Sequence, residues 1–439
     1  MRRPGSSPED REERIVRILR SVEERLRREL PEGPQTLDQI EETVERVGEE
    51  IKEDIQSEIV EGCGSGYSGT RIACRCCGGE ARYKADHVRS VVTLHGEQVI
   101  GRAYYYCSSC RRGFHPVDAK LELGRGQCSV RVRALACRFA SYLPFGVAAR
   151  ELELVCGIAL SASSIQRIAK QTGKAVGLEW HERQKRLSEH PTQDPNTRAP
   201  KQLHISMDGV MAHVDGGWRE VKLGVCYERE DEKGPRRASY YATLAPSAQF
   251  GARMRTLTWC VGEPLCRQVA VVADGSEWIW QETGKYFTQR VQILDFYHVS
   301  EHLWALARVR FGEGSAQAQE WVSEQKEHLL NDRVESVLTD IRTWQPSTKA
   351  GEELRRKELA FLGEHVHRMR YKTFRAAGYH VGSGVMESSC RWVVQQRMKG
   401  AGMRWSADGA EKMLQLRTAW CSRSHADLLN ATRAAALAA

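Results

Sequence analysis

Two aspartates interrupt apolar, strand-like segments of this sequence and give the first indication of its chemistry. Asp208 lies within Leu203–Val214, and Asp274 ends the apolar run Val269–Asp274. Carboxylates in apolar surroundings are costly unless cations neutralise them. Side by side, these two would suit a pair of Mg²⁺ or Mn²⁺ ions, the usual solution for phosphodiester chemistry.

The segments around these aspartates follow a defined order. Strand patterns occur five times, with helices expected after the third and the fourth: Leu203–Val214, Trp218–Tyr227, Ser239–Leu244, Val269–Asp274 and Val291–Asp295. The order β-β-β-α-β-α-β is that of a ribonuclease-H-like α/β fold. In that fold the first and fourth strands are neighbours, so we expect Asp208 and Asp274 to lie side by side.

A third carboxylate would complete the metal cage. Glu387, at the start of a basic helical segment, can supply it, with Glu277 as a minor rival; an N-terminal helix charge is the structural alternative for Glu387. The basic and aromatic residues of this segment suit DNA backbone contact and base stacking, or else form a solvated face. They are Arg391, Trp392, Arg397, Lys399, Arg404 and Trp405.

Four cysteines have the spacing of a zinc site. Cys74 and Cys77 form one C-x₂-C pair, and Cys107 and Cys110 form a second after 29 residues. A hairpin turning at Gly96 is expected between them, so the segment predicts a zinc ribbon with one structural Zn²⁺. Free thiols near a loop are the alternative, and Cys76 is a less apt ligand because of its C-x-C spacing.

A helix–glycine–helix pattern follows the ribbon. Ala148–Cys156 is expected to turn Leu152 and Val155 inward, and Gly157 allows a tight turn before a second helix, Ser164–Thr172. The outward face of that second helix offers Gln166, Arg167 and Lys170 to phosphates or base edges. The pattern predicts a DNA-binding helix-turn-helix, with ordinary helical packing as the alternative.

Composition agrees with a polyanionic partner. The 439 residues carry a net charge of +8, and the signs are segregated: residues 9–60 hold 17 acidic and 9 basic side chains, whereas residues 124–178 hold 8 basic and 2 acidic ones. Such basic excess suits DNA. No stretch is apolar enough to span a membrane, no secretory signal is evident, and the scattered cysteines fit a reducing cytoplasm.

These patterns predict five regions. They are a helical segment at 1–62, a zinc ribbon at 63–120, a helix-turn-helix domain at 121–183, a linker at 184–200 and a catalytic domain at 201–439. The apolar stripes of the first segment either pack on the chain itself or form a coiled-coil-like contact between copies, and the second case favours a homo-oligomer.

Four segments resemble bacterial insertion-sequence transposases of the ISKra type, which are related to Mutator-like DDE transposases. The segments are MDG at 207–209, ADGSEWIW at 273–280, LDFYHVSEHLW at 294–304 and GSGVMESSCRWVVQQRMKGAGMRWS at 382–406. The resemblance implies Asp208, Asp274 and Glu387 as a catalytic triad that holds two Mg²⁺ or Mn²⁺ ions. It also implies accessory roles for Asp295 and His298, and a helical insertion at about 299–380.

The function implied by this resemblance is transposition: binding of the terminal inverted repeats of an insertion sequence, metal-dependent strand cleavage, and transfer to target DNA. A non-catalytic regulator derived from such an enzyme is the alternative. His365 and Arg368 match the H-x-x-R element of tyrosine recombinases, with Tyr371 or Tyr379 as the nucleophile, but the spacing is short. No phosphate-binding loop occurs, so no nucleotide cofactor is expected.

Overall fold

The structure is a computed structural model that describes residues 8–30, 33–124, 126–195, 197–228, 236–422 and 425–438. Parts of the predicted regions lie outside these residues: 1–7 and 31–32 of the N-terminal segment, 125 and 196, and 229–235, 423–424 and 439 of the predicted catalytic region. The described residues form helices and two β-sheets, so the chain is a mixed α/β protein, as the strand and helix patterns predicted.

The first half of the chain contains these elements: α1 (Pro8–Glu29), α2 (Leu37–Gly62), β1 (Arg71–Ala73), β2 (Glu80–Thr93), β3 (Gly96–Cys107), β4 (Arg112–Phe114), α3 (Pro116–Lys120), α4 (Val130–Tyr142), α5 (Phe145–Cys156), α6 (Ala162–Glu189), β5 (Gln202–Val214) and β6 (Gly217–Glu228). The second half contains these: β7 (Arg236–Thr243), α7 (Ser247–Cys260), the 3₁₀-helix η1 (Glu263–Leu265), β8 (Gln268–Ala273), α8 (Glu277–Tyr286), β9 (Val291–Leu294), α9 (Phe296–Phe311), α10 (Ala316–Leu330), α11 (Val334–Thr343), α12 (Lys349–Glu364), the 3₁₀-helix η2 (Val366–Arg368), α13 (Tyr371–Ala376), α14 (Gly384–Ser389), the π-helical turn η3 (Cys390–Gln395), α15 (Gln396–Met398), α16 (Ala407–Ser422) and α17 (His425–Ala438).

Contacts divide the chain into two compact units, residues 1–172 with 427–439, and residues 173–426. The sequence patterns had instead predicted that residues 427–439 belong to the catalytic domain, together with residues 201–426. The first unit holds them closely because Gly124 leaves room for the backbone of α17: a Cβ at Gly124 would lie 2.1 Å from the carbonyl oxygen of Ala436.

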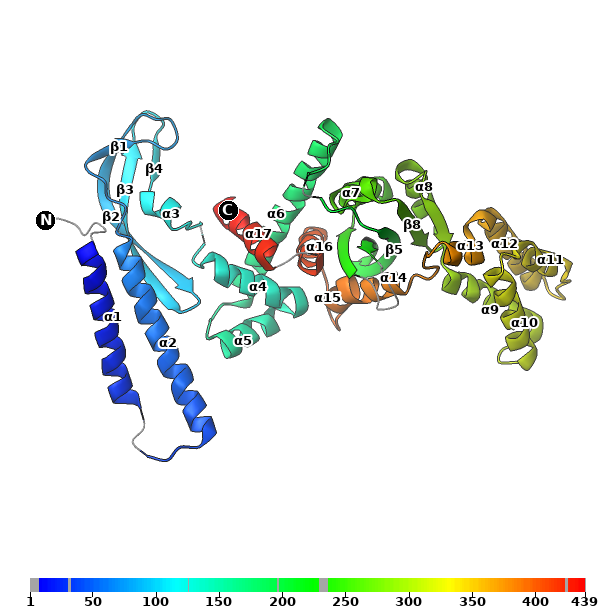
Figure 1. Ribbon diagram of the computed structural model, residues 1–439, viewed down its shortest axis with the longest axis horizontal. Coiled ribbons are helices and arrows are strands. Elements are labelled where there is room, and N and C mark those ends of the chain that lie inside the picture. The colour runs from blue at the N-terminus through cyan, green and yellow to red at the C-terminus, as the bar shows by residue number, and fades with distance from the viewer. Residues whose placement is uncertain are drawn as a thin grey trace. The chain divides into compact units, whose positions relative to one another are not determined.

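The first unit contains an antiparallel sheet with the strand order β1-β2-β3-β4 (Figure 1). The long β2–β3 hairpin confirms the predicted turn, where Gly96 adopts a φ of +83° that a side chain would strain. Both strands extend beyond the predicted segments, back to the two cysteine pairs. The hairpin therefore brings both C-x₂-C pairs to one end of the sheet.

The N-terminal helices α1 and α2 pair with each other through charges. Arg25 of α1 binds Asp54 and Glu50 of α2, and Arg46 of α2 binds Glu29 of α1. The capping box of Thr36 and Gln39 begins α2. The helices thus pack on their own chain, but several apolar side chains of the predicted stripes stay exposed, and a contact between copies stays a prediction: Ile15, Leu19, Ile40, Val44 and Ile59.

Helices α5 and α6 are separated by Gly157, whose φ of +63° ends α5 as the tight turn required. Leu152 is buried as predicted, and Ile165 and Ile168 of α6 are buried as well. Val155, predicted to face inward, is 65 % exposed in the last turn of α5. The second helix is also longer than predicted: α6 continues to Glu189 and takes in the first six residues of the predicted linker, 184–189.

The second unit is built on a five-stranded sheet with the order β7-β6-β5-β8-β9. The strands β7, β6 and β5 are antiparallel, while β5, β8 and β9 run parallel. The predicted adjacency of the first and fourth strands is confirmed by the β5–β8 pairing. Figure 1 shows α7 on one side of this sheet and α14 on the other, so both faces are covered and the central strands are buried.

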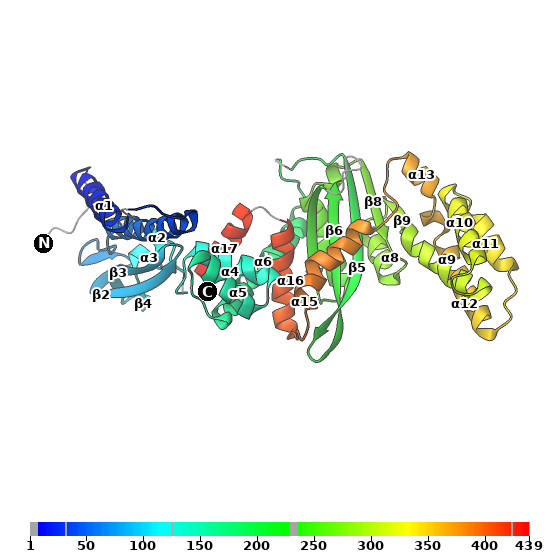
Figure 2. The same ribbon diagram turned by 90° about the horizontal axis from the view of Figure 1, so that it is seen from below.

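The helices α9 to α13 lie between β9 and α14 and form a bundle beyond the β9 edge (Figure 2). They occupy residues 296–376, close to the predicted insertion at 299–380. None of the helices in the described parts of the chain is both long and apolar enough to cross a membrane.

A test of this packing uses two helical glycines of the second unit. A Cβ at Gly173 of α6 would lie 2.0 Å from the carbonyl oxygen of Lys412 in α16, whereas Gly284 of α8 is exposed with nothing within 4 Å. We expect Gly173→Ala to lower the free energy of unfolding by about 1–3 kcal/mol, because backbone would have to move. Gly284→Ala should raise it by about 0.5–1 kcal/mol through helix propensity. Denaturant unfolding of both variants measures the two effects, and equal effects would contradict the α6–α16 contact.

Candidate functional site

Three aspartates lie just beyond the parallel pairing of neighbouring strands in the second unit: Asp208 within β5, and Asp274 and Asp295 directly after β8 and β9. Ile205 of β5 pairs with Val271 of β8, so the same register carried three residues further sets Asp208 opposite Asp274. Ala273 of β8 pairs with Leu294 of β9, so the next residues, Asp274 and Asp295, are neighbours as well. The sheet therefore gathers three carboxylates at one edge.

Asp208 is half-buried and has weak hydrogen-bond support. Its Oδ1 accepts from the amide of Gly209 at 2.6 Å, and its Oδ2 lies 3.3 Å from the Cys390 thiol. Burial raises the pKa of Asp208, and the negative charge of Asp274 raises it further, although the thiol's hydrogen bond opposes the shift. The fold thus places a carboxylate where its charged form is disfavoured, as expected where a cation can bind.

Asp274 ends β8 and is held at the start of α8. Its two oxygens accept from the amide and hydroxyl of Ser276 at 2.9 and 3.0 Å. The next residue, Gly275, packs under the ring of Phe361 from α12, where a Cβ would lie 2.0 Å from a ring carbon. The helical bundle therefore fixes the turn that carries Asp274.

Asp295 differs from the other two aspartates because its oxygens are occupied by protein donors. It caps α9 by accepting from the amide of Tyr297 at 2.7 Å, and it accepts from both the amide and the hydroxyl of Ser383. Burial raises its pKa, which these hydrogen bonds partly offset. Asp295 thus ties β9 to the segment that begins α14, and this supports an accessory position.

Glu387 reaches the same region from α14, but it is the most exposed of the predicted triad. Its side chain is 76 % exposed and lies 3.4 Å from Arg391. The donor atoms of the four cysteines all lie within 4.8 Å of one another, and among the described residues no group of three or more carboxylates is that compact. Asp208, Asp274 and Glu387 line one cavity without approaching that closely.

That cavity has a volume of about 690 Å³ and mixes acidic with basic side chains. Besides the three predicted catalytic carboxylates, its lining includes Asp295, His298, Glu301, Arg391 and Lys399. A larger cavity of about 1010 Å³ between β7, α7 and α16 contains none of the predicted catalytic residues. The acidic cavity is therefore the candidate active site.

The predicted DNA-contacting residues of the last basic segment separate into two groups. Arg391, Trp392, Lys399 and Arg404 are exposed. Arg397 is only 1 % exposed, its guanidinium stacks 4.8 Å from the Trp405 ring, and burial beside Arg417 lowers its pKa to about 10. Trp405 is half-buried and donates to the carbonyl of Met398 at 3.2 Å. The prediction of Arg397 as a DNA contact was wrong because this arginine fills the interior, and Trp405 is tied to it.

The helix-turn-helix residues point outward. Gln166 and Arg167 are exposed and Lys170 is half-buried, all on the first turns of α6. Ser161 begins this helix by accepting from the amide of Ser164 at 3.2 Å. A face with exposed donors is thus present, and its use for DNA stays a prediction.

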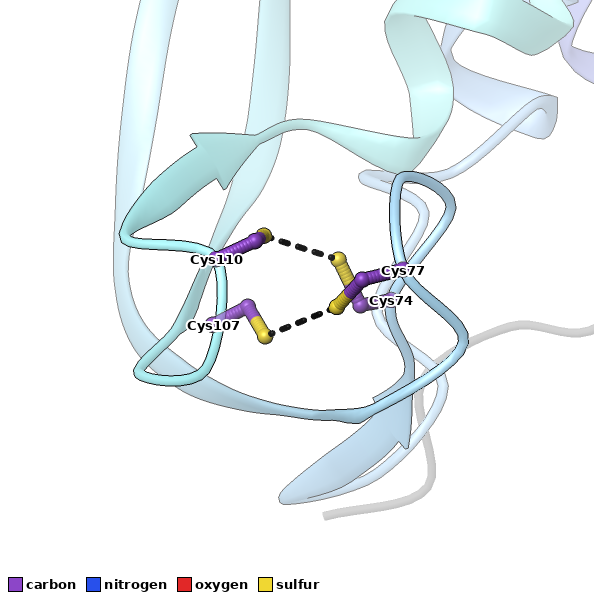
Figure 3. A group of neighbouring side chains, drawn as sticks. All are labelled: Cys74, Cys77, Cys107 and Cys110. Carbon is purple, nitrogen blue, oxygen red and sulfur yellow. Dashed lines mark hydrogen bonds between the residues drawn. The ribbon is translucent and has the colours of Figure 1, made fainter.

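The predicted cysteine pairs come together at one end of the first unit's sheet. Figure 3 shows the sulfurs of Cys74, Cys77, Cys107 and Cys110 facing one another, with Cys74–Cys110 at 3.6 Å and Cys77–Cys107 at 3.7 Å. Amide hydrogen bonds from the Cys110 backbone lower the pKa of Cys107 to about 6, and amides of Cys76 and Cys77 lower that of Cys74. The amides thus favour thiolates at Cys107 and Cys74, whereas burial raises the pKa of Cys110 to about 12. The group could hold a metal ion.

The structure also adds residues that the sequence patterns missed. Cys390 lies beside Asp208, and its position three residues after Glu387 was a usable signal, since such residues share a helix face. His302 follows the predicted His298 by four residues, one helical turn, which was an equal signal, whereas Ser383 and Glu358 had none. Tyr371, the recombinase-like alternative nucleophile, is fully buried and donates to the carbonyl of Leu294 at 3.0 Å, so it is not presented to a substrate.

Two comparisons with known sequences identify the family. The model of the uncharacterised protein family UPF0236 matches residues 36–427. A Streptococcus gallolyticus protein named "UPF0236 protein in vanSb 3'region" is 27 % identical over 351 residues, which cover 75 % of this chain and 72 % of that protein.

These matches correct the family resemblance drawn from short segments. The assignment to ISKra-type and Mutator-like DDE transposases was wrong, because the family model that covers most of the chain is a different one and the relative carries the same family name. The chain belongs to the UPF0236 family.

Proposed function

We propose that this protein is a transposase that binds the ends of its insertion sequence and cleaves and joins DNA strands at the acidic cavity. The observation that carries the proposal is the placement of Asp208 and Asp274 on neighbouring parallel strands that open, with Glu387, into one cavity. The strand order β7-β6-β5-β8-β9 agrees with the ribonuclease-H-like core predicted from the sequence.

The carboxylates fit divalent cations by their chemistry. Asp208 and Asp274 repel each other in a half-buried place, and oxygen donors are those that Mg²⁺ and Mn²⁺ prefer. In the proposal Asp208, Asp274 and Glu387 hold two such ions. When bound, the ions would activate water or a DNA 3′-hydroxyl and stabilise the leaving oxygen.

The protein's own groups would position the DNA strand. Arg391 and Lys399, exposed at the cavity, can neutralise backbone phosphates next to the carboxylates. Asp295 holds Ser383 and with it the start of the helix that carries Glu387. Because the carboxylates bind metal and do not attack phosphorus, no covalent protein–DNA intermediate is expected.

Two further parts of the chain support DNA binding in this proposal. The four cysteines fit one structural Zn²⁺, since sulfurs about 2.3 Å from a tetrahedral zinc lie roughly 3.8 Å apart, close to the 3.6 and 3.7 Å seen here. With the surrounding strands they would form a zinc ribbon. Helices α5 and α6 would act as a helix-turn-helix on the terminal inverted repeats, with the protein working as a homo-oligomer on DNA.

The triad is tested by removing one carboxylate charge at a time. Asp208→Asn, Asp274→Asn and Glu387→Gln should each abolish Mg²⁺-dependent cleavage and joining of element-end DNA while DNA binding persists, because the amides cannot offset cation charge. Mn²⁺ should replace Mg²⁺, whereas Ca²⁺ should bind without turnover. Glu277→Gln, an exposed carboxylate on α8, is the matched control and should cut normally. Cleavage by Glu387→Gln but not by Glu277→Gln would reassign the third carboxylate. A wild-type protein that binds but never cuts would be a DNA-binding regulator.

The zinc site is tested by metal analysis. Purified protein should contain one zinc per chain, and Cys107→Ser should lose it and unfold the sheet of β1 to β4, because the four ligands join the two cysteine-bearing segments at one end of that sheet. Cys76→Ser is the control: this cysteine is exposed and outside the group, so its variant should keep the metal. Limited proteolysis and atomic-emission analysis report the two outcomes. Zinc-free protein with an intact sheet would disprove the site.

The helix-turn-helix is tested by charge removal on α6. Arg167→Ala combined with Lys170→Ala should weaken binding to element-end DNA and reduce the salt dependence of the binding constant by about two counterions, one for each lost phosphate contact. Lys185→Ala, an exposed lysine later on the same helix, should have little effect. Equal affinities of the wild type and the double variant across salt concentrations would reject this face as the DNA contact.

A further inference from the structure

A line of polar side chains runs from the helical bundle to the acidic cavity. Glu358 of α12 is 4 % exposed, and its Oε2 lies 2.6 Å from Nδ1 of His302 on α9. Nε2 of His302 lies 3.2 Å from Nε2 of His298, one helical turn earlier. His298 lines the acidic cavity, so the three residues connect a buried carboxyl group to the candidate active site.

The two imidazole rings are held by packing. Phe361 of α12 stacks on His302 with ring centroids 4.2 Å apart and an interplanar angle of 18°, and it meets His298 edge-on at 6.3 Å. Phe361 is also the ring that covers Gly275, beside Asp274. One aromatic side chain therefore fixes both the histidine pair and the turn of a predicted catalytic residue.

The positions of the hydrogens along this line determine whether Nδ1 of His298 is a hydrogen-bond donor toward the cavity. A carboxylate accepts only, so Nδ1 of His302 must donate to Glu358. One hydrogen is shared between the facing Nε2 atoms. At the other end of the pair, Nδ1 of His298 lies 3.4 Å from Oε2 of Glu301, a second carboxylate that can only accept. With a carboxylate facing each Nδ1 and one hydrogen between the two rings, this arrangement places hydrogen on three of the four ring nitrogens, and Nδ1 of His298 is one of them.

We propose that Glu358 and His302 are positioning residues that keep Nδ1 of His298 as a hydrogen-bond donor to the phosphate of a DNA strand in the acidic cavity. The inference rests on the proposed function, because DNA is the phosphate source to which it commits. Oε2 of Glu301 lies 3.4 Å from this nitrogen, and its side chain is 78 % exposed. Glu301 can accept from His298 and move aside when a phosphate arrives.

A hydrogen-bond donor at this position would help to offset the repulsion between a phosphate and the carboxylates of the cavity. Asp208, Asp274 and Glu387 repel a phosphate, so a strand can enter only with cationic groups around it. Arg391 and Lys399 supply charge on flexible side chains, whereas the histidine pair supplies it at a position fixed by the bundle. The insertion would thereby contribute to orientation of the scissile strand and not only to the stability of the sheet edge.

The first experiment reads the protons without any activity. In ¹⁵N-histidine-labelled protein at neutral pH, Nδ1 of His298, assigned with a His298→Asn variant, should be protonated. In Glu358→Gln it should be bare, because a neutral partner removes the need for the third proton. Glu352→Gln, exposed on the same helix, is the control and should leave the spectrum unchanged. A bare His298 Nδ1 in the wild type, or a proton that survives in a folded Glu358→Gln protein, would overturn the relay.

The second experiment separates the relay from the proposed function. Adding a short DNA duplex in EDTA should shift the His298 Nδ1 signal, and an unchanged signal at saturation would overturn the role in phosphate binding. In single-turnover cleavage, Glu358→Gln and His298→Asn should each be slowed about tenfold or more, and the double variant no further. A wild type that cuts while Glu358→Gln cuts equally fast rejects the positioning role. A wild type that never cuts rejects the proposed function, and the proton count and duplex titration still decide the relay.

Discussion

Repulsion between carboxylates on neighbouring parallel strands is the constraint on which the candidate site of the second unit depends. The register of β5, β8 and β9 places Asp208, Asp274 and Asp295 next to one another in a row. Asp295 is stabilised by protein donors, and Asp274 has only the Ser276 pair. Asp208 accepts from one amide and a thiol, and burial together with the charge of Asp274 raises its pKa, a cost that a bound cation would offset.

Elements outside the sheet are arranged around this row. The bundle reaches it through Phe361 over Gly275 and through the line from Glu358 to His298. From the other side, the π-helical turn after α14 departs from the usual α-helical hydrogen-bond pattern, and the buried Arg417 of α16 donates to the carbonyl of Trp392 within that turn. That turn carries Cys390 to Asp208 and leaves Glu387 at the cavity. The acidic row is thus held by helices far apart in the sequence.

Local periodicity was sufficient to predict the strands, the β2–β3 hairpin and the meeting of four cysteines, because each follows from alternation, turn residues or ligand spacing. The β5–β8 adjacency was predicted from the order of strands and helices along the chain. It failed where tertiary packing decides. The charge of Arg397 suggested a DNA contact, but its side chain is buried and its guanidinium stacks on the Trp405 ring. The spacing of Val155 predicted a buried side chain, but it is exposed in the last turn of α5. His302 and Glu358 are 56 positions apart, so no sequence window could join them.

The two candidate metal sites differ in how far the chain alone assembles them. Four sulfurs already lie at distances that suit tetrahedral zinc, since two knuckles and a hairpin fix the backbone at both ends. The acidic site is open: Glu387 is drawn toward Arg391 at 3.4 Å, and both side chains reach into solvent. A backbone phosphate competes with Glu387 for Arg391, because both are anions and the guanidinium binds either. Under the proposed function, arrival of a DNA strand would free the carboxylate of Glu387 from this exposed contact.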